Sequence, residues 1–153
     1  MPVKGRICFD DGKSLFSSPA FRELSATAIR VLLLFYCRRQ FVKMGAKGKE
    51  RTVISNNGKI QFPYAEAQKQ FKIGGKSFSK ALDKLIEVGF LDIKHAGGGM
   101  LGSSTLYAIS ERWRKFGAIN FERAKRDKDT RGFGFTLDNW EEMTGRARKH
   151  SSI

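Results

Sequence analysis

A change of hydrophobic period along residues 58–110 constrains the fold more than any other feature of the sequence. Apolar residues first recur at helical spacing in two segments separated by a glycine turn, and then follow strand patterns around a glycine-rich loop. The second helical segment has a complete apolar stripe and is followed by Gly89, a residue type that commonly ends helices. The predicted elements are, in order, a strand at 59–62, helices at 64–71 and 77–88, and strands at 90–95 and 105–110.

Two serines predict the starts of earlier helices. Ser18 stands before Pro19, a pairing typical of a helix start, and predicts a short helical turn. Ser25 precedes a run in which apolar residues recur every three or four positions, so we predict a long helix from Ala26 to about residue 43. On this helix Cys37 is expected to be a core thiol.

The connector at residues 44–57 is polar and basic. Asn57 and Gly58 together favour a tight turn, which predicts a hairpin with strands at 51–55 and 59–62. Its basic side chains are expected to be solvated, with phosphate contact as the less favoured alternative.

Composition favours a folded domain with a polyanionic partner. The chain has 153 residues, 41% of them hydrophobic, which suits one domain with a sizeable core and an appended arm. The net charge of +14 and the pI of about 10.1 favour a nucleic acid as the partner, although a merely solvated charged surface is the alternative.

No set of residues with catalytic or metal-binding spacing is recognisable. The two cysteines form no CxxC pair, and two histidines are too few for a histidine-based metal site. The glycines at 97–102 match a dinucleotide-binding pattern, but a strand follows them where that pattern needs a helix. We therefore expect no enzyme activity, no cofactor and no metal, and a cytoplasmic protein without a membrane segment.

The candidate DNA-binding residues lie on the polar side of the two later helices and on the last hairpin. On the helix at 77–88 and just before it, side chains opposite the apolar stripe are suited to reading base edges. Lysines nearby suit phosphate groups, and the hairpin adds polar residues beside its glycines. The base-edge candidates are Lys76, Ser77, Ser79 and Lys80, with Lys84 on the same face; Lys69 and Lys72 are phosphate candidates, and the hairpin offers Lys94, His95, Ser103 and Ser104.

Residues 25–33, 58–62 and 78–91 together resemble winged helix-turn-helix proteins, most of all the replication-initiator type of plasmids, phages and other mobile elements. The order helix, turn, helix and β-hairpin independently favours the same α+β fold. The predicted organisation is a leader at 1–17, a winged helix-turn-helix domain at 18–116 and a C-terminal arm at 117–153.

The resemblance implies sequence-specific binding of double-stranded DNA in replication initiation or its control, and a homodimer is compatible with it. Similar passages occur in transcription repressors, which gives a second hypothesis. A third is a basic adaptor that binds RNA or an acidic protein. In the arm, charge is divided into basic and acidic stretches, so we expect it to dock through Phe133 and Trp140 on the domain or on a second copy, and not to form the main DNA surface.

Overall fold

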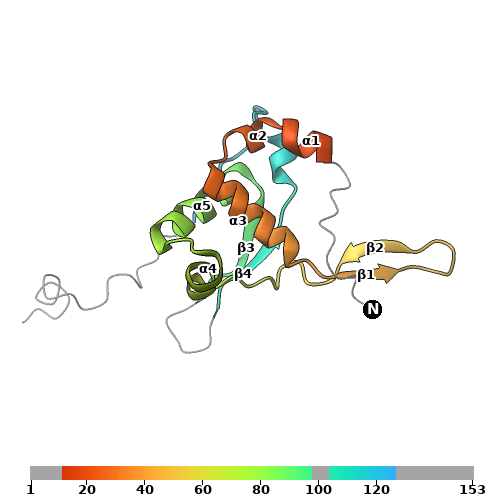
Figure 1. Cartoon of the computed structure of the whole chain (residues 1–153). Coiled ribbons are helices and arrows are strands. Elements are labelled where there is room, and N and C mark those ends of the chain that lie inside the picture. Colours follow the sequence, from red (N-terminus) through yellow and green to blue (C-terminus); the bar gives the residue numbers. More distant parts are fainter. Residues whose placement is uncertain (1–11, 98–103, 127–153) are drawn as a thin grey trace, which may run out of the picture.

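The computed structural model describes residues 12–97 and 104–126, which form an α+β fold (Figure 1). Within these ranges five α-helices and a short 3-10 helix accompany two antiparallel sheets of two strands each. The helices are α1 Gly12–Ser17, α2 Pro19–Arg22, α3 Ala26–Cys37, α4 Tyr64–Phe71, α5 Gly75–Val88 and the 3-10 helix η1 Arg112–Lys115. The strands are β1 Phe41–Met44, β2 Arg51–Ile54, β3 Leu91–His95 and β4 Leu106–Ile109.

Both predicted serine caps are confirmed. The Ser18 hydroxyl accepts a hydrogen bond from the backbone N–H of Phe21 at 3.1 Å, and the Ser25 hydroxyl accepts one from Ala28 at 3.2 Å. The helix α1 was not foreseen, because residues 12–17 lie in the predicted leader; its Leu15 is buried in the core.

Helix α3 is shorter than predicted and ends at Cys37 instead of near residue 43. The chain beyond it forms β1, whose residues pair with β2. The buried face of α3 includes Ala28, Val31, Leu32 and Phe35, at the spacing of one helical stripe. Cys37 follows Phe35 by two positions and therefore points away from that face. The expectation of a core thiol was wrong, since Cys37 is exposed.

The predicted hairpin around Asn57 and Gly58, with paired strands at 51–55 and 59–62, was also wrong. Strand β2 pairs with β1, in a register that joins Phe41 to Ile54. The segment after the turn instead adds Ile60 as a bridge to Tyr107 of β4, with N···O distances of 3.2 and 2.8 Å. We predicted no strand at β1, because the apolar residues of this segment continue the helical spacing of α3.

The elements of the 64–110 region are those predicted. Helix α4 has the predicted bounds, α5 begins two residues before the predicted start, and β3 and β4 pair antiparallel. The predicted stripe of α5 is buried, and Gly89 ends the helix with a φ of 97°.

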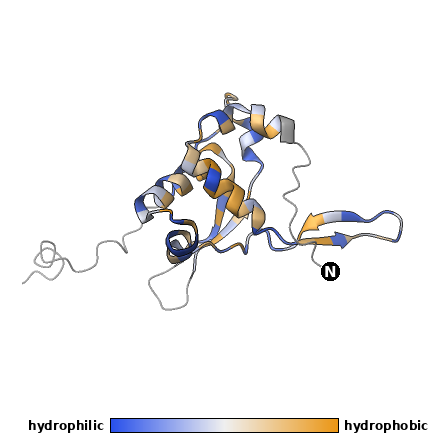
Figure 2. Cartoon of the chain, viewed as in Figure 1, coloured by the Kyte–Doolittle hydropathy of each residue, from blue (hydrophilic) through white to orange (hydrophobic). Residues whose placement is uncertain are grey.

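A cluster of aromatic rings joins these elements into one core. The Phe62 ring lies 5.3 Å from Phe35 of α3 and 4.9 Å from Phe78 of α5, and Phe35 lies 5.2 Å from Tyr107 of β4, all in edge-to-face geometry. Apolar residues line the facing sides of α3, α5 and the β3–β4 sheet (Figure 2). The cluster fixes α5 relative to both α3 and the sheet, and so determines which side of α5 stays accessible.

The predicted packing of Trp113 and Phe116 is confirmed. Trp113 is buried and stacks on Phe90 at 5.5 Å, and Phe116 packs against the core at its edge. A Cβ at Gly89 would lie 2.7 Å from the backbone nitrogen of Trp113, so this close approach requires glycine as strictly as the positive φ does.

Candidate nucleic-acid interface

A three-residue turn between α4 and α5 sets the start of α5. Lys72 adopts a left-handed conformation with a φ of 56°, and buried Ile73 donates its N–H to the carbonyl of Ala67 at 3.0 Å. Gly74 is the N-cap of α5 and supplies no side-chain hydrogen bond. The N–H groups of the first turn therefore donate no hydrogen bond to an N-cap side chain, and such uncapped helix N-termini are suited to contact with phosphate.

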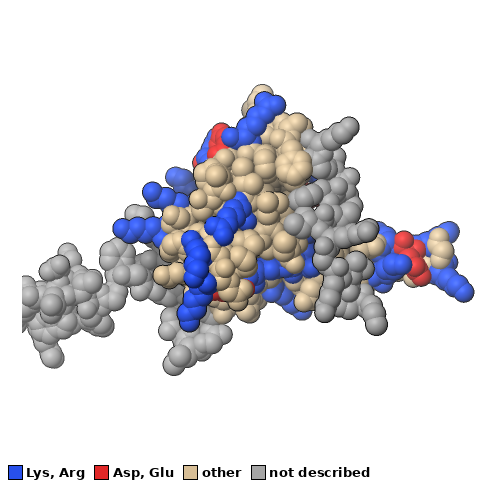
Figure 3. Space-filling view, in the orientation of Figure 1, with Lys and Arg blue, Asp and Glu red and all other residues tan. Residues whose placement is uncertain are grey.

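The predicted lysines around this turn are exposed and carry unneutralised charge. Within residues 12–97 and 104–126, none of them forms an ion pair. Figure 3 shows basic side chains spread over the face where α3, α4 and α5 lie, with few acidic ones among them. The lysines are Lys69, Lys72, Lys76 and Lys80 on or beside the two helices, and Lys94 on β3.

The two predicted serines of α5 differ in their surroundings. Ser77 is exposed. Ser79 is half-buried, and its hydroxyl lies 2.6 Å from a guanidinium nitrogen of Arg126. The same guanidinium pairs with Asp83 at 2.7 Å and donates to the Tyr64 hydroxyl at 3.0 Å. The Ser79 hydroxyl therefore already has a partner within the chain.

Lys84, predicted with this group, has its ammonium in a cluster of internal ion pairs. It lies 3.0 Å from Glu23 and 3.3 Å from Glu87, and Arg123 contacts the same two carboxylates at 3.3 and 2.6 Å. The hydrogen bond from Lys84 lowers the pKa of Glu23 and that from Arg123 lowers the pKa of Glu87, while Glu23 raises the pKa of Lys84. Lys84 thus joins α5 to the chain after α2, and Arg123 joins the C-terminal segment to both.

The β3–β4 hairpin places one of its predicted residues, Ser104, near the start of α4. A register irregularity between Ile93 and His95 leaves exposed Lys94 as an extra residue in β3, and such bulges redirect side chains. Exposed Ser104 lines a groove of about 170 Å³ with Tyr64, the first residue of α4. His95 is exposed at the end of β3, whereas Ser103 lies outside the described residues.

The sequence did not reveal that residues 117–126 cross α5. This segment contains no helix, and Arg123 and Arg126 fasten it to α5 and its neighbours. Its partners on α5 lie at least 36 positions away, a separation for which local periodicity gives no signal. The predicted docking residues Phe133 and Trp140 lie outside the described residues.

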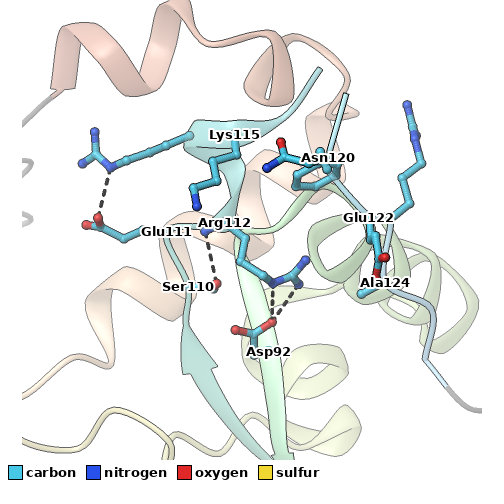
Figure 4. A pocket seen from close by; sticks show the side chains of 11 residues that line it. Asp92, Ser110, Glu111, Arg112, Lys115, Asn120, Glu122 and Ala124 are labelled. Carbon is cyan, nitrogen blue, oxygen red and sulfur yellow. Dashed lines mark hydrogen bonds and ion pairs between the residues drawn. The ribbon is translucent and has the colours of Figure 1, made fainter. Parts of the chain in front are cut away.

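A second hollow, of about 890 Å³, lies between β3, η1 and the C-terminal segment (Figure 4). Arg112 points across it to Asp92 at 2.7 Å and also donates to the carbonyls of Ile86 and Leu91. Arg114 pairs with Glu111 at 3.0 Å. Because its arginines are paired with carboxylates, this hollow is less suited to binding an anion than the surface formed by the lysines around α5.

Among the described residues no group of three or more His, Cys, Asp and Glu side chains is placed to hold a metal ion. No helix in the same ranges combines the length and apolar character that crossing a membrane requires. Comparison of the chain with protein-family models, with curated proteins and with solved structures finds no match.

Proposed function

We propose that this protein binds double-stranded DNA as a winged helix-turn-helix domain. In this proposal α4 and α5 are the helix-turn-helix, α5 enters the major groove, and the β3–β4 hairpin is the wing. The supporting observation is that the turn and the first half of α5 carry exposed lysines that form no ion pair with any described residue, beside an uncapped helix N-terminus. A polyanion that follows this surface would neutralise all of these charges together.

Roles within the interface follow from position. Lys76, Ser77 and Lys80 lie on the N-terminal half of α5 and are assigned to base edges, where lysine donates to guanine O6 and N7. Lys69 and Lys72 are assigned to phosphate groups, as is Lys94 of the wing. We leave Lys84 out of the interface because its ammonium is held by Glu23 and Glu87.

We further propose that the DNA target is an origin of a mobile element, where the protein initiates or controls replication inside the cell. This assignment rests on the resemblance of 25–33, 58–62 and 78–91 to replication initiators. Footprinting tests it: protection of iterated origin repeats supports it, whereas protection of a promoter palindrome favours a transcription repressor.

The matched pair Lys80→Ala and Lys84→Ala tests the DNA-binding surface. The two lysines lie one helical turn apart, but within the part of the chain that the structure describes Lys84 is in an ion pair and Lys80 is not. Lys80→Ala should weaken duplex binding by about 1–3 kcal/mol in a sequence-dependent manner, and Lys84→Ala should change it little. The wild-type affinity should fall with salt at a log-log slope of about −4 to −7, as about five to eight phosphate contacts give.

Absence of wild-type binding to any duplex at low salt would reject the proposal and favour the basic adaptor. Equal losses in both variants would show that net charge, and not this surface, carries the affinity. Thermal melting of both variants separates these outcomes from unfolding.

A further inference from the structure

The β1–β2 hairpin is a basic arm that projects from the body of the protein (Figure 1). Its 41–54 segment contains four basic residues and one acidic residue, Glu50. Within the described residues none of the four cations forms an ion pair, and all are exposed. The four are Lys43, Lys47, Lys49 and Arg51.

Two asparagines fix the base of this arm to the core. The Asn56 side chain accepts from the backbone N–H of Gln40 and donates to the carbonyl of Arg38, both at 2.8 Å, and so joins the base of the arm to the end of α3. The Asn57 side chain accepts from the N–H of Ile109 at 2.7 Å and donates to its carbonyl at 3.2 Å, on β4. A two-stranded hairpin is marginal by itself, and these contacts give it a defined exit direction.

The arm carries charge on both of its faces. Cross-strand neighbours share a face and successive pairs alternate, so the Lys43–Thr52 pair and the Met44–Arg51 pair present one cation on each side. Lys47 and Lys49 occupy the connecting turn. A ribbon with cations on both faces suits a DNA groove, where phosphates of the two strands lie on either side, and the major groove admits a two-stranded ribbon.

The reach of the arm exceeds that of a side chain. About seven residues separate its base from its tip, which at about 3.3 Å per residue is roughly 20 Å, or about six base pairs of duplex at about 3.4 Å each. Figure 1 shows the arm leaving the body on the side away from the start of α5. It would therefore meet a duplex beyond the bases that α5 contacts.

We propose that the β1–β2 hairpin is a second DNA-contacting arm, which binds duplex flanking the α5 site through Lys43, Lys47, Lys49 and Arg51. This inference rests on the proposed DNA binding by α5. From the sequence we expected these charges to be merely solvated. Solvation alone does not explain why the base of the arm is fixed to the core. The large apolar side chains exposed on the arm are those of Val42 and Met44, so charge dominates its surface and favours a polyanion over a second copy of the chain.

The test compares Lys47→Ala/Lys49→Ala with Arg22→Ala/Lys115→Ala in the full chain. The control pair removes the same charge from exposed positions on α2 and η1. Affinities are measured on a duplex of about 12 base pairs and on one of about 30, at several salt concentrations. On the long duplex the arm variant should bind about tenfold more weakly, with a salt slope shallower by about 2 if both lysines contact phosphate.

On the short duplex the arm variant should match the wild type, and the control should match it on both. Hydroxyl-radical protection should shorten on one side of the long duplex in the arm variant only. Unchanged affinity, slope and protection in a folded arm variant would overturn the inference while leaving the α5 proposal intact. A change in sedimentation without a change in DNA binding would also overturn it and assign the arm to self-association. Failure of the wild type to bind either duplex would overturn both proposals.

Discussion

The guanidinium group of Arg126 lies 2.6 Å from the hydroxyl of Ser79, although the two residues are 47 positions apart in the chain. The Arg126 side chain retains only 15% of its exposure and pairs with Asp83, whose side chain is 54% exposed. The C-terminal segment thus places a cation on the side of α5 that we assign to DNA, and its ion pair offsets the charge of an acidic group that would repel phosphate.

Arg126→Ala should weaken DNA binding, because it removes this cation and leaves the charge of the exposed Asp83 carboxylate without its Arg126 partner on α5. It should also lower the free energy of unfolding by about 1–2 kcal/mol through the lost hydrogen bonds. Fluorescence anisotropy with a labelled duplex and chemical denaturation measure the two effects.

Asp83→Asn in the Arg126→Ala background is the matched control and should recover part of the affinity. Tighter binding by Arg126→Ala alone would contradict this interpretation, and would indicate that Arg126 obstructs Ser79 from reading a base.

Gly89→Ala should destabilise the fold by about 2–4 kcal/mol, because a positive φ is strained for alanine and the new Cβ meets the chain at Trp113. Gly48→Ala is its control: Gly48 has a φ of 86° but no atom within 4 Å of the added Cβ. The control should cost only about 1–2 kcal/mol, from backbone strain. Equal melting temperatures for the two variants would show that the close packing of η1 on Gly89 does not contribute to the stability of the fold.

Acid should destabilise the protein partly through the Glu23–Lys84–Glu87–Arg123 cluster. Its ion pairs lower the pKa of both glutamates below the usual 4.5. The stabilisation is therefore complete above about pH 4.5 and is lost as the pH falls through the lowered values. The groups are partly exposed, so the effect should be modest and should diminish in high salt.

Glu87→Gln measures that contribution. Its unfolding free energy should be lower than that of the wild type near pH 7, and the two values should converge as the pH is lowered toward 3. Parallel pH profiles for the two proteins would exclude a role of Glu87 in acid sensitivity.

Two truncations separate the parts of the C-terminal arm. Deletion of everything after Arg126 should keep the stability contributed by Arg123 and Arg126, whereas deletion after Phe116 should lose it and leave a folded, less stable core that still binds DNA. Denaturation and sedimentation of both truncated chains make the comparison. Loss of nearly all DNA affinity in a folded chain cut after Arg126 would identify residues 127–153 as a direct DNA binder, against our expectation.

Local patterns in the sequence were sufficient for the elements from Tyr64 to Ile109. The bounds of α4, the stripe of α5 and the end of α5 at Gly89 follow from residue spacing and glycine placement, which act within a few positions. The same reasoning extended α3 beyond Cys37, because Phe41 and Val42 fit a helical period as well as a strand. Pairing with β2 decided between the two.

The sequence by itself determined which lysines occur on and beside α4 and α5, the serine caps of α2 and α3, and the order of the elements around α5. Only the tertiary structure decided which cations have acidic partners among the described residues: Lys80 stays exposed while Lys84 is bound by Glu23, 61 positions away. It also decided that Arg126 crosses α5 and that Asn56 and Asn57 fix the basic arm. Periodicity reports which face of an element is apolar, but ion pairs between distant segments depend on how the core brings those segments together.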